Sequence, residues 1–133
     1  MALTAGRNTV EVQDGKTLVL PVKANAKIFE GSLVVLDATG YAVPGSTAEG
    51  LKAAGRAEEF VDNTGGADGA KTVRVRRGVF KWNNDDANPV TEADLMKDCY
   101  IKDDETVTML AVGTSVAGKV IRLDNGEVIV ETL

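Results

Sequence analysis

The C-terminal segment places the tightest constraint on what this chain can fold into. Asn125-Gly126 separates two β-rich runs at residues 116–123 and 127–131. An Asn-Gly pair between alternating runs is the strongest short-range signal for a β-hairpin, because both turn residues must adopt positive φ. The sequence therefore predicts a terminal β-hairpin.

Most of the remaining chain also predicts short strands. The run at 33–36 (LVVL) is continuously apolar, as expected for a strand buried on both faces. Residues 72–76 (TVRVR) alternate cleanly, and a phase shift at Arg77-Gly78 predicts a β-bulge. Pro21 places the strand before it at an edge or a bulge, because proline donates no ladder hydrogen bond.

Helix signals are scarce. Thr91 and Asp94 have the spacing of a capping box, which predicts one short helix near residues 91–98. Residues 48–60 have helical propensity, but Gly50 and Gly55 would each cost about 1 kcal/mol inside a helix. This segment is therefore expected to be strand or irregular.

These patterns favour an all-β fold, either a small barrel or a sandwich. The length of 133 residues fits one domain, expected over residues 17–133. In residues 1–16, Leu3, Val10 and Val12 are spaced too sparsely for a helix. We interpret them as an extended N-terminal arm that could add a strand to a neighbour, with a frayed terminus as the alternative.

Composition excludes several classes of chemistry. The chain has no histidine and a single cysteine, Cys99, so it lacks a Ser-His-Asp triad, a Cys-x-x-Cys motif and an intrachain disulfide. No apolar run approaches the roughly 20 residues of a membrane span. A net charge of −5 argues against nonspecific nucleic-acid binding. We therefore expect no enzyme, no cofactor, no nucleic-acid partner and no membrane.

Two further segments have compositions that occur in binding sites. Asp103-Asp104-Glu105 could bind Ca²⁺ or Mg²⁺, but it lacks the EF-hand spacing and no metal is expected there. Residues 65–69 are glycine-rich but lead into a strand, whereas a phosphate-binding loop leads into a helix. A hairpin loop is the expected role of that segment.

Charge is segregated along the chain. Residues 71–81 are basic and contain no acid, whereas residues 82–105 contain eight acids and two lysines. The simpler interpretation is a solvated strand edge beside a solvated loop. The functional interpretation is a pair of complementary patches that meet head-to-tail between subunits. That interface would comprise Arg74, Arg76 and Arg77 facing Asp85, Asp86 and Asp103, with Trp82 as a buried anchor.

Two ordered patterns resemble a known family. The first is Gly55-Arg56-Ala57, then Val61-Asp62-Asn63 and Gly65-Gly66, leading into the strand at 73–82. The second is Cys99-Tyr100-Ile101 followed by Asp103-Asp104. Together they resemble, over residues 20–131, the small capsid decoration (cement) proteins of tailed bacteriophages and prophages.

The resemblance implies a structural virion protein without cofactors. Such proteins are made in the bacterial host cytoplasm and bind the major capsid protein on the outside of the expanded head. They sit at local symmetry axes, often as homotrimers at threefold positions, and oppose the internal pressure of packaged DNA. The sparse arm would then contact the capsid through Leu3, Val10 and Val12.

Three other functions remain open from the sequence. A tail-tube or head–tail connector component is also small, β-rich and oligomeric. A glycan-binding β-module would need exposed aromatic residues, for which Tyr41, Trp82 and Tyr100 are candidates. A small hydrolase using carboxylates is the least favoured, because no motif marks a catalytic pair.

Overall fold

A computed structural model describes residues 2, 4–9 and 13–133. Within these residues the chain forms twelve strands and one 3₁₀ turn. The elements are β1 (Thr17–Pro21), β2 (Lys27–Ile28), β3 (Leu33–Leu36), β4 (Ala42–Pro44), β5 (Lys52–Ala57), β6 (Val61–Asp62), β7 (Thr72–Arg76), β8 (Gly78–Asn84), η1 (Glu92–Asp94), β9 (Asp98–Ile101), β10 (Thr106–Thr108), β11 (Val116–Asp124) and β12 (Glu127–Thr132). The predicted all-β class is confirmed.

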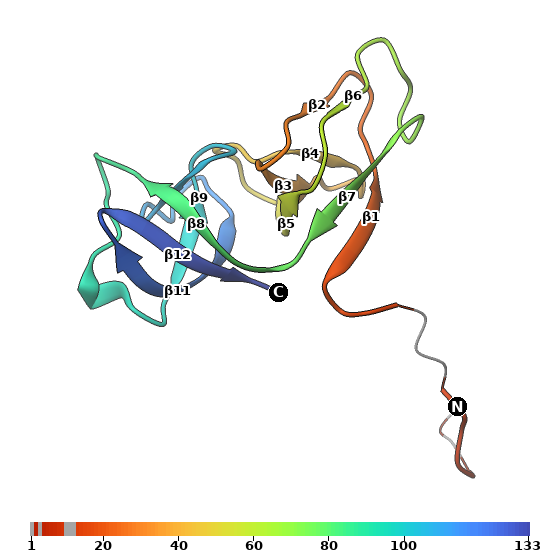
Figure 1. Ribbon diagram of the computed structural model, residues 1–133, viewed down its shortest axis with the longest axis horizontal. Coiled ribbons are helices and arrows are strands. Elements are labelled where there is room, and N and C mark those ends of the chain that lie inside the picture. Colours follow the sequence, from red (N-terminus) through yellow and green to blue (C-terminus); the bar gives the residue numbers. More distant parts are fainter. Residues whose placement is uncertain (1, 3, 10–12) are drawn as a thin grey trace.

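The strands form two main units that lie side by side along the long axis (Figure 1). One is a five-stranded sheet in the order β1-β7-β5-β3-β4, and the other is a closed barrel in the order β10-β8-β12-β11-β9. Strands β2 and β6 pair separately as a short ribbon. A small barrel, one of the two predicted architectures, is therefore present.

The five-stranded sheet curls around its own core. Beyond β1, Val22 forms a parallel bridge to Ala42 of the opposite edge strand, β4. Val22 N donates to Lys71 O at 2.9 Å, and Lys23 N donates to Ala42 O at 3.1 Å. The two edges of the sheet thus meet at one end, which leaves fewer unpaired backbone groups there.

Strand β3 is shared by the two units. Leu33 and Val35 pack in the barrel core, whereas Val34 packs in the core of the sheet, and all three are fully buried. Successive side chains of a strand point to opposite faces, so β3 forms a wall between two apolar clusters. This explains the continuous apolar run at 33–36 and confirms the predicted burial on both faces.

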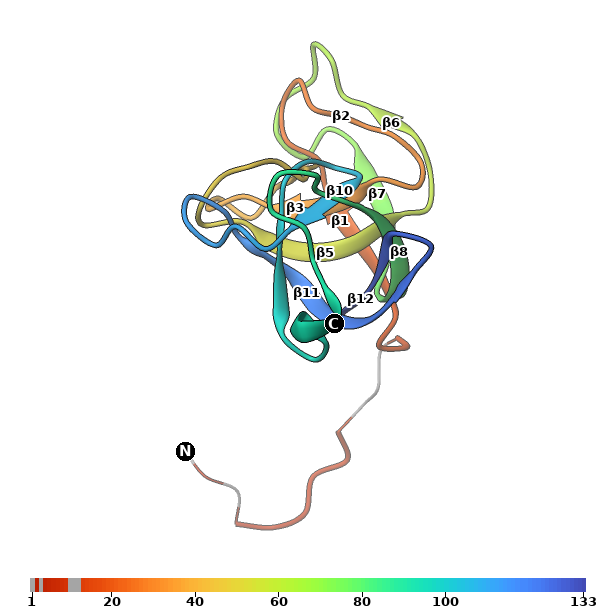
Figure 2. The ribbon, with the colours of Figure 1, turned by 90° about the vertical axis from the view of Figure 1, so that its left-hand side faces the viewer.

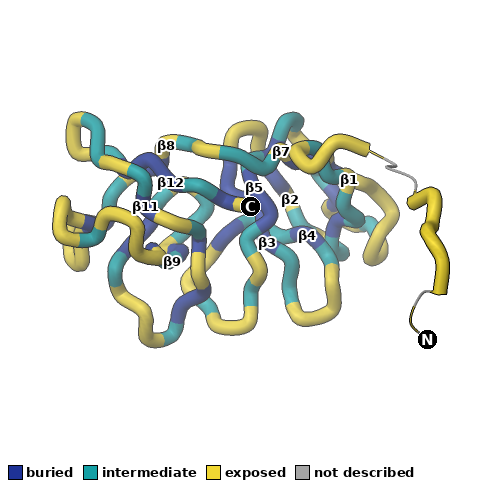
Figure 3. Tube along the Cα trace, turned by 90° about the horizontal axis from the view of Figure 1, so that it is seen from below, coloured by how far each residue is buried: buried dark blue, intermediate teal, exposed yellow. Residues whose placement is uncertain are grey.

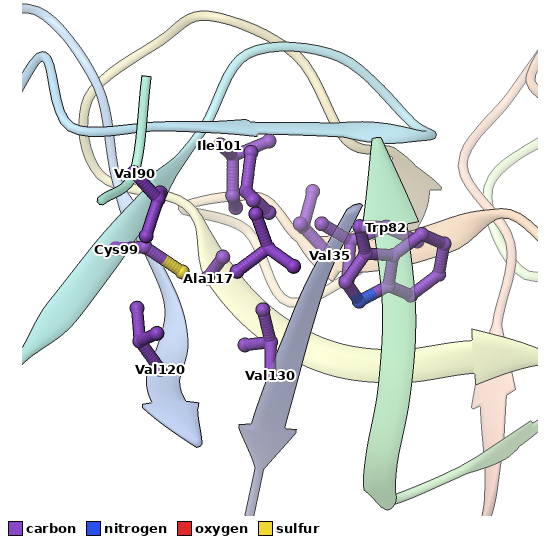
Figure 4. Packing of buried hydrophobic residues seen from close by; sticks show 11 residues of the cluster. Val35, Trp82, Val90, Cys99, Ile101, Ala117, Val120 and Val130 are labelled. Carbon is purple, nitrogen blue, oxygen red and sulfur yellow. The ribbon is translucent and has the colours of Figure 1, made fainter. Parts of the chain in front are cut away.

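The barrel core is filled mainly by aliphatic side chains (Figure 4). Val35 enters it from β3 and lies near Trp82 of β8. The buried members of this cluster are Leu33, Val35, Trp82, Val90, Cys99, Ile101, Val107, Ala117, Val120, Val128 and Val130.

The chain passes from sheet to barrel between β7 and β8. The predicted bulge at Arg77-Gly78 is wrong, because the two strands belong to different ladders: β7 pairs with β1 and β5, and β8 with β12 and β10. The phase shift in the sequence marks this transfer. Arg77 N donates to Lys16 O at 2.7 Å, and Gly78 adopts φ 154°.

Two other local predictions are confirmed. Asn125 and Gly126 adopt φ values of 51° and 81° and join β11 to β12, which gives the expected hairpin. Residues 52–57 of the ambiguous segment form β5. Gly55 adopts φ 143° there, and a Cβ at this position would lie 2.2 Å from Arg76 O, so the close approach of β5 to its neighbour β7 requires glycine.

The helix expected near residues 91–98 is reduced to the 3₁₀ turn η1. Thr91 N donates to Asp94 Oδ2 at 2.9 Å, as the capping spacing predicted. Leu95 leaves the helical region at φ −56° and ψ 135°, and Met96 follows at φ 68°. Met96 N donates to Val120 O at 2.7 Å, so the chain is drawn to the barrel before a second turn can form.

The N-terminal arm is only partly described. Leu3, Val10 and Val12, the residues expected to contact a capsid, lie outside the described residues. The described residues before β1 are exposed (Figure 3). Asp14 Oδ1 accepts from Thr17 N at 2.9 Å, and Gln13 Nε2 donates to Thr17 O at 2.8 Å. These contacts cap the outer edge of β1, and Pro21 lies on that edge strand as predicted.

Replacing Gly55 by alanine tests the close approach of β5 to β7. We expect Gly55→Ala to lower the free energy of unfolding by about 2–4 kcal/mol, because the new Cβ meets a backbone carbonyl at a φ that disfavours side chains. Urea denaturation measures the change. Gly15→Ala is the control, since nothing lies within 4 Å of its Cβ position. Equal stability of the two variants would contradict the assignment.

Candidate interaction surface

The outer face of the sheet carries the basic strand. Val73 and Val75 of β7 are buried, so the alternating Arg74 and Arg76 point outward. Arg56 of β5 pairs directly with Arg76 in the ladder and lies on the same face. The sequence pattern at 72–76 thus produces a cationic face backed by an apolar core.

Two of these arginines have partners within the chain. Arg74 Nε lies 3.1 Å from Glu59 Oε2, and Arg56 Nη2 lies 2.9 Å from Glu58 Oε1. The guanidinium of Arg56 also lies over the Phe80 ring, 4.6 Å from its centroid. The backbone N–H and side chain of Arg74 hold the pKa of Glu59 below its usual value.

The remaining cations surround a hollow where β7 passes into β8. It is lined by the cationic residues Lys16, Arg76 and Arg77 and by the apolar residues Val79 and Leu133. Val79 and Leu133 are each more than half exposed. Phe80 and Glu131 complete most of its wall. We call this hollow the basic groove, and its lining includes Leu133 at the C-terminal end of the chain. No described carboxylate lies within ion-pair distance of the Arg76 or Arg77 guanidinium.

Asp85 corrects the expected interface. Only 4% of it is exposed, and its carboxylate accepts from Lys102 Nζ at 2.7 Å and from Thr108 Oγ1 at 2.9 Å. The backbone N–H groups of Ala87 and Asn88 also donate to it. The Lys102 and Thr108 hydrogen bonds lower the pKa of Asp85 to about 2. Asp85 therefore anchors its own loop and is not free to face a neighbouring subunit.

The other expected acids lie at the surface. Asp86 is exposed on the loop after β8. Asp103 is half-buried and accepts from Glu105 N at 2.9 Å. Burial and the adjacent Asp103 raise the pKa of Asp104 above its usual value. Pairing of Asp86 or Asp103 with arginines of another subunit stays a prediction.

Trp82 lies in the barrel core rather than at a surface. It is 5% exposed and lies among the buried side chains of the barrel (Figure 4). Its ring meets that of Phe80 edge-on, with ring centroids 6.3 Å apart. Its Nε1 has no hydrogen-bond partner among the described residues. The expected role as an interface anchor is therefore corrected, because almost no indole surface is left for a second chain.

The most exposed aromatic residues were not singled out by the sequence. Phe29 follows β2 and Phe60 precedes β6, and they are 56% and 53% exposed. Their ring centroids lie 5.4 Å apart. The pairing of Ile28 with Val61 brings the two rings together, and no local pattern announces that pairing. A hollow beside Phe29 is also lined by Glu30, Asp104 and Glu105.

The glycine-rich loop at 65–69 is not the expected hairpin loop, because β6 pairs with β2 whereas β7 pairs with β1 and β5. Asn63 is buried, and its Nδ2 donates to Lys23 O and Ala67 O, both at 3.0 Å. Asp68 Oδ1 accepts from Ala24 N at 2.8 Å. These contacts hold the loop against the segment that follows β1.

In the described part of the chain, no group of three or more Cys, Asp or Glu side chains is arranged to hold a metal ion. No helix among the described residues is both long and apolar enough to cross a bilayer.

Cys99 is a core residue, as the sequence predicted. It is fully buried on β9, and burial raises the pKa of its thiol to about 12. The reactive thiolate form is therefore scarce at neutral pH.

Comparison with known proteins gives no relative: no family model, curated protein or solved structure matches this chain.

Removing the Asp85 charge tests its anchoring role. The pKa of Asp85 is lower in the folded than in the unfolded chain, so its ionised form stabilises the fold above about pH 4, and this stability is lost as the pH falls toward about 2. We expect Asp85→Asn to unfold at lower urea than the parent at pH 7, with the difference shrinking toward pH 2. Asp86→Asn, one residue along on the exposed loop, should follow the parent. Parallel pH profiles for Asp85→Asn and the parent would contradict the role.

Thiol labelling tests the burial of Cys99. We expect a disulfide reagent such as DTNB to react with the native protein at pH 8 only at the rate of global or local opening, and at once in 6–8 M urea (roughly the range that unfolds small domains). Absorbance of the released thiolate measures both rates. Fast stoichiometric labelling of folded protein would show that the thiol is accessible.

Proposed function

We propose that this chain is a capsid decoration protein, a structural virion component that binds the outer surface of an expanded phage head and stabilises it. The observation that carries the proposal is the position of the residues behind the family resemblance. They lie at points that determine the shape of the fold, not in a pocket equipped for catalysis.

Those positions span both halves of the molecule. Gly55 permits the close approach of β5 to its neighbour β7, and Asn63 holds the glycine-rich loop. Cys99 and Ile101 are fully buried in the barrel core. Residues 73–82 form most of the β7–β8 passage that joins the two units. These residues determine the backbone geometry and the core packing of the fold. Such a pattern suits a structural protein that binds by the complementarity of its surface to a partner.

Binding to a repeating shell suits a small protein of this design. Each subunit buries two cores and still leaves charged and apolar groups on its surface. Several modest contacts made together bind much more tightly than any one alone, because the later contacts form at high effective concentration. We propose the major capsid protein and further copies of this chain as partners, with a homotrimer at local threefold positions.

Co-sedimentation with DNA-free shells of the phage that encodes the chain tests the proposal. We expect saturable binding to expanded shells and none to compact shells, because the sites would form only on expansion. The number of copies bound per capsomer would give the symmetry position. Absence of binding to both forms would overturn the proposal. Closed rings of purified protein in electron micrographs would then favour a tail-tube or connector component.

A further inference from the structure

We propose that the Phe29–Phe60 pair of one subunit docks on the basic groove of a second copy of this chain. The inference rests on the proposed function, in which copies associate on a shell, and it names the surfaces they use. It gives the basic strand a partner other than Asp85, whose carboxylate is bonded within its own chain.

The aromatic pair has the character of a protein contact. Both rings are more than half exposed although they touch each other, so they form one apolar ridge rather than two scattered side chains. Ridges of this kind on soluble proteins mark interaction sites, and large aromatic residues contribute much of the binding energy at interfaces.

Carboxylates border this ridge. Glu30 and Glu105 are exposed beside Phe29, with Asp104 in the same hollow. None of the three has an ion-pair partner among the described residues. A partner that covers the rings must therefore also bring positive charge to their rim.

The basic groove meets both requirements. Lys16, Arg76 and Arg77 supply the charge, and the exposed Val79 and Leu133 supply apolar surface. Within the chain, Arg56 already lies over the ring of Phe80, which shows how an arginine of this region can cover a phenylalanine. Glu131 also lines the groove, but the three cations outnumber this one carboxylate, so the groove and the acid-bordered ridge are complementary in net sign and in apolar content.

One molecule cannot join its own two surfaces. The β2–β6 ribbon beside the aromatic pair lies at the top in Figures 1 and 2, and the β7–β8 passage lies well below it. The contact is therefore heterologous, with each copy offering one surface of each kind. Such contacts close into a ring when the rotation between copies allows and extend into a stack when it does not.

Charge exchange between two variants tests the contact. One variant carries Glu30→Arg and Glu105→Arg, and the other carries Arg76→Glu and Arg77→Glu. We expect each alone to self-associate at least about tenfold more weakly than the parent in sedimentation equilibrium, because like charges then face each other. An equimolar mixture should regain 1:1 association, which weakens as salt is added. Glu92→Arg and Arg122→Glu, at exposed positions away from both surfaces, should associate like the parent.

The aromatic contribution is tested separately. We expect Phe60→Ala to weaken self-association at least about tenfold. Val112→Ala is the control, because Val112 is an apolar residue that is more exposed than Phe60 and lies outside both surfaces, and it should leave self-association unchanged. Circular dichroism and thermal melting of every variant exclude a folding defect as the cause.

The outcomes separate this inference from the proposed function. A parent protein that stays monomeric, or a mixture that fails to regain association, would overturn the contact. Shell binding that persists in that case would leave the decoration role standing. Association through these surfaces in a protein that binds no shell would overturn the decoration role alone.

Discussion

The burial of β3 on both faces is the constraint on which the rest of the structure depends. Leu33 and Val35 fill the barrel while Val34 fills the sheet, so one short strand contributes to two cores. Each fully buried side chain of this size is worth roughly 1.5–3 kcal/mol relative to an exposed one. The two cores therefore share this wall, and the pairing of β3 with β4 and β5 holds it in the sheet.

The β7–β8 passage turns that architecture into surface chemistry. Strand β7 ends in the sheet at Arg76, and β8 begins in the barrel at Gly78, with only Arg77 between them. Arg76 and Arg77 therefore lie together at the junction of the two units. At the end of β7 the Arg76 carbonyl lies so close to Gly55 of the neighbouring β5 that no Cβ fits there. The basic groove is therefore a consequence of how the two units are joined.

Internal pairing decides which charges remain for a partner. Glu59 engages Arg74, and Lys102 with Thr108 engages Asp85, so part of the expected interface is consumed within the chain. Exposed pairs such as Arg74–Glu59 contribute little to stability, but they remove charge from the surface a neighbour would meet. What remains is the basic groove on one side and an acid-bordered phenylalanine pair on another, which is the arrangement that head-to-tail association of copies requires.

The sequence by itself determined the features that consecutive residues encode. Asn125-Gly126 specified its hairpin through the φ values of two neighbours, and the alternation at 72–76 specified which side chains point inward. Tertiary structure alone decided the features that depend on strand register. The pairing of Ile28 with Val61 brings Phe29 to Phe60, and the Met96 bond to Val120 cuts the helix to one turn. Local patterns report backbone preference and periodicity, whereas contacts between distant residues depend on how strands align, and no single segment records that alignment.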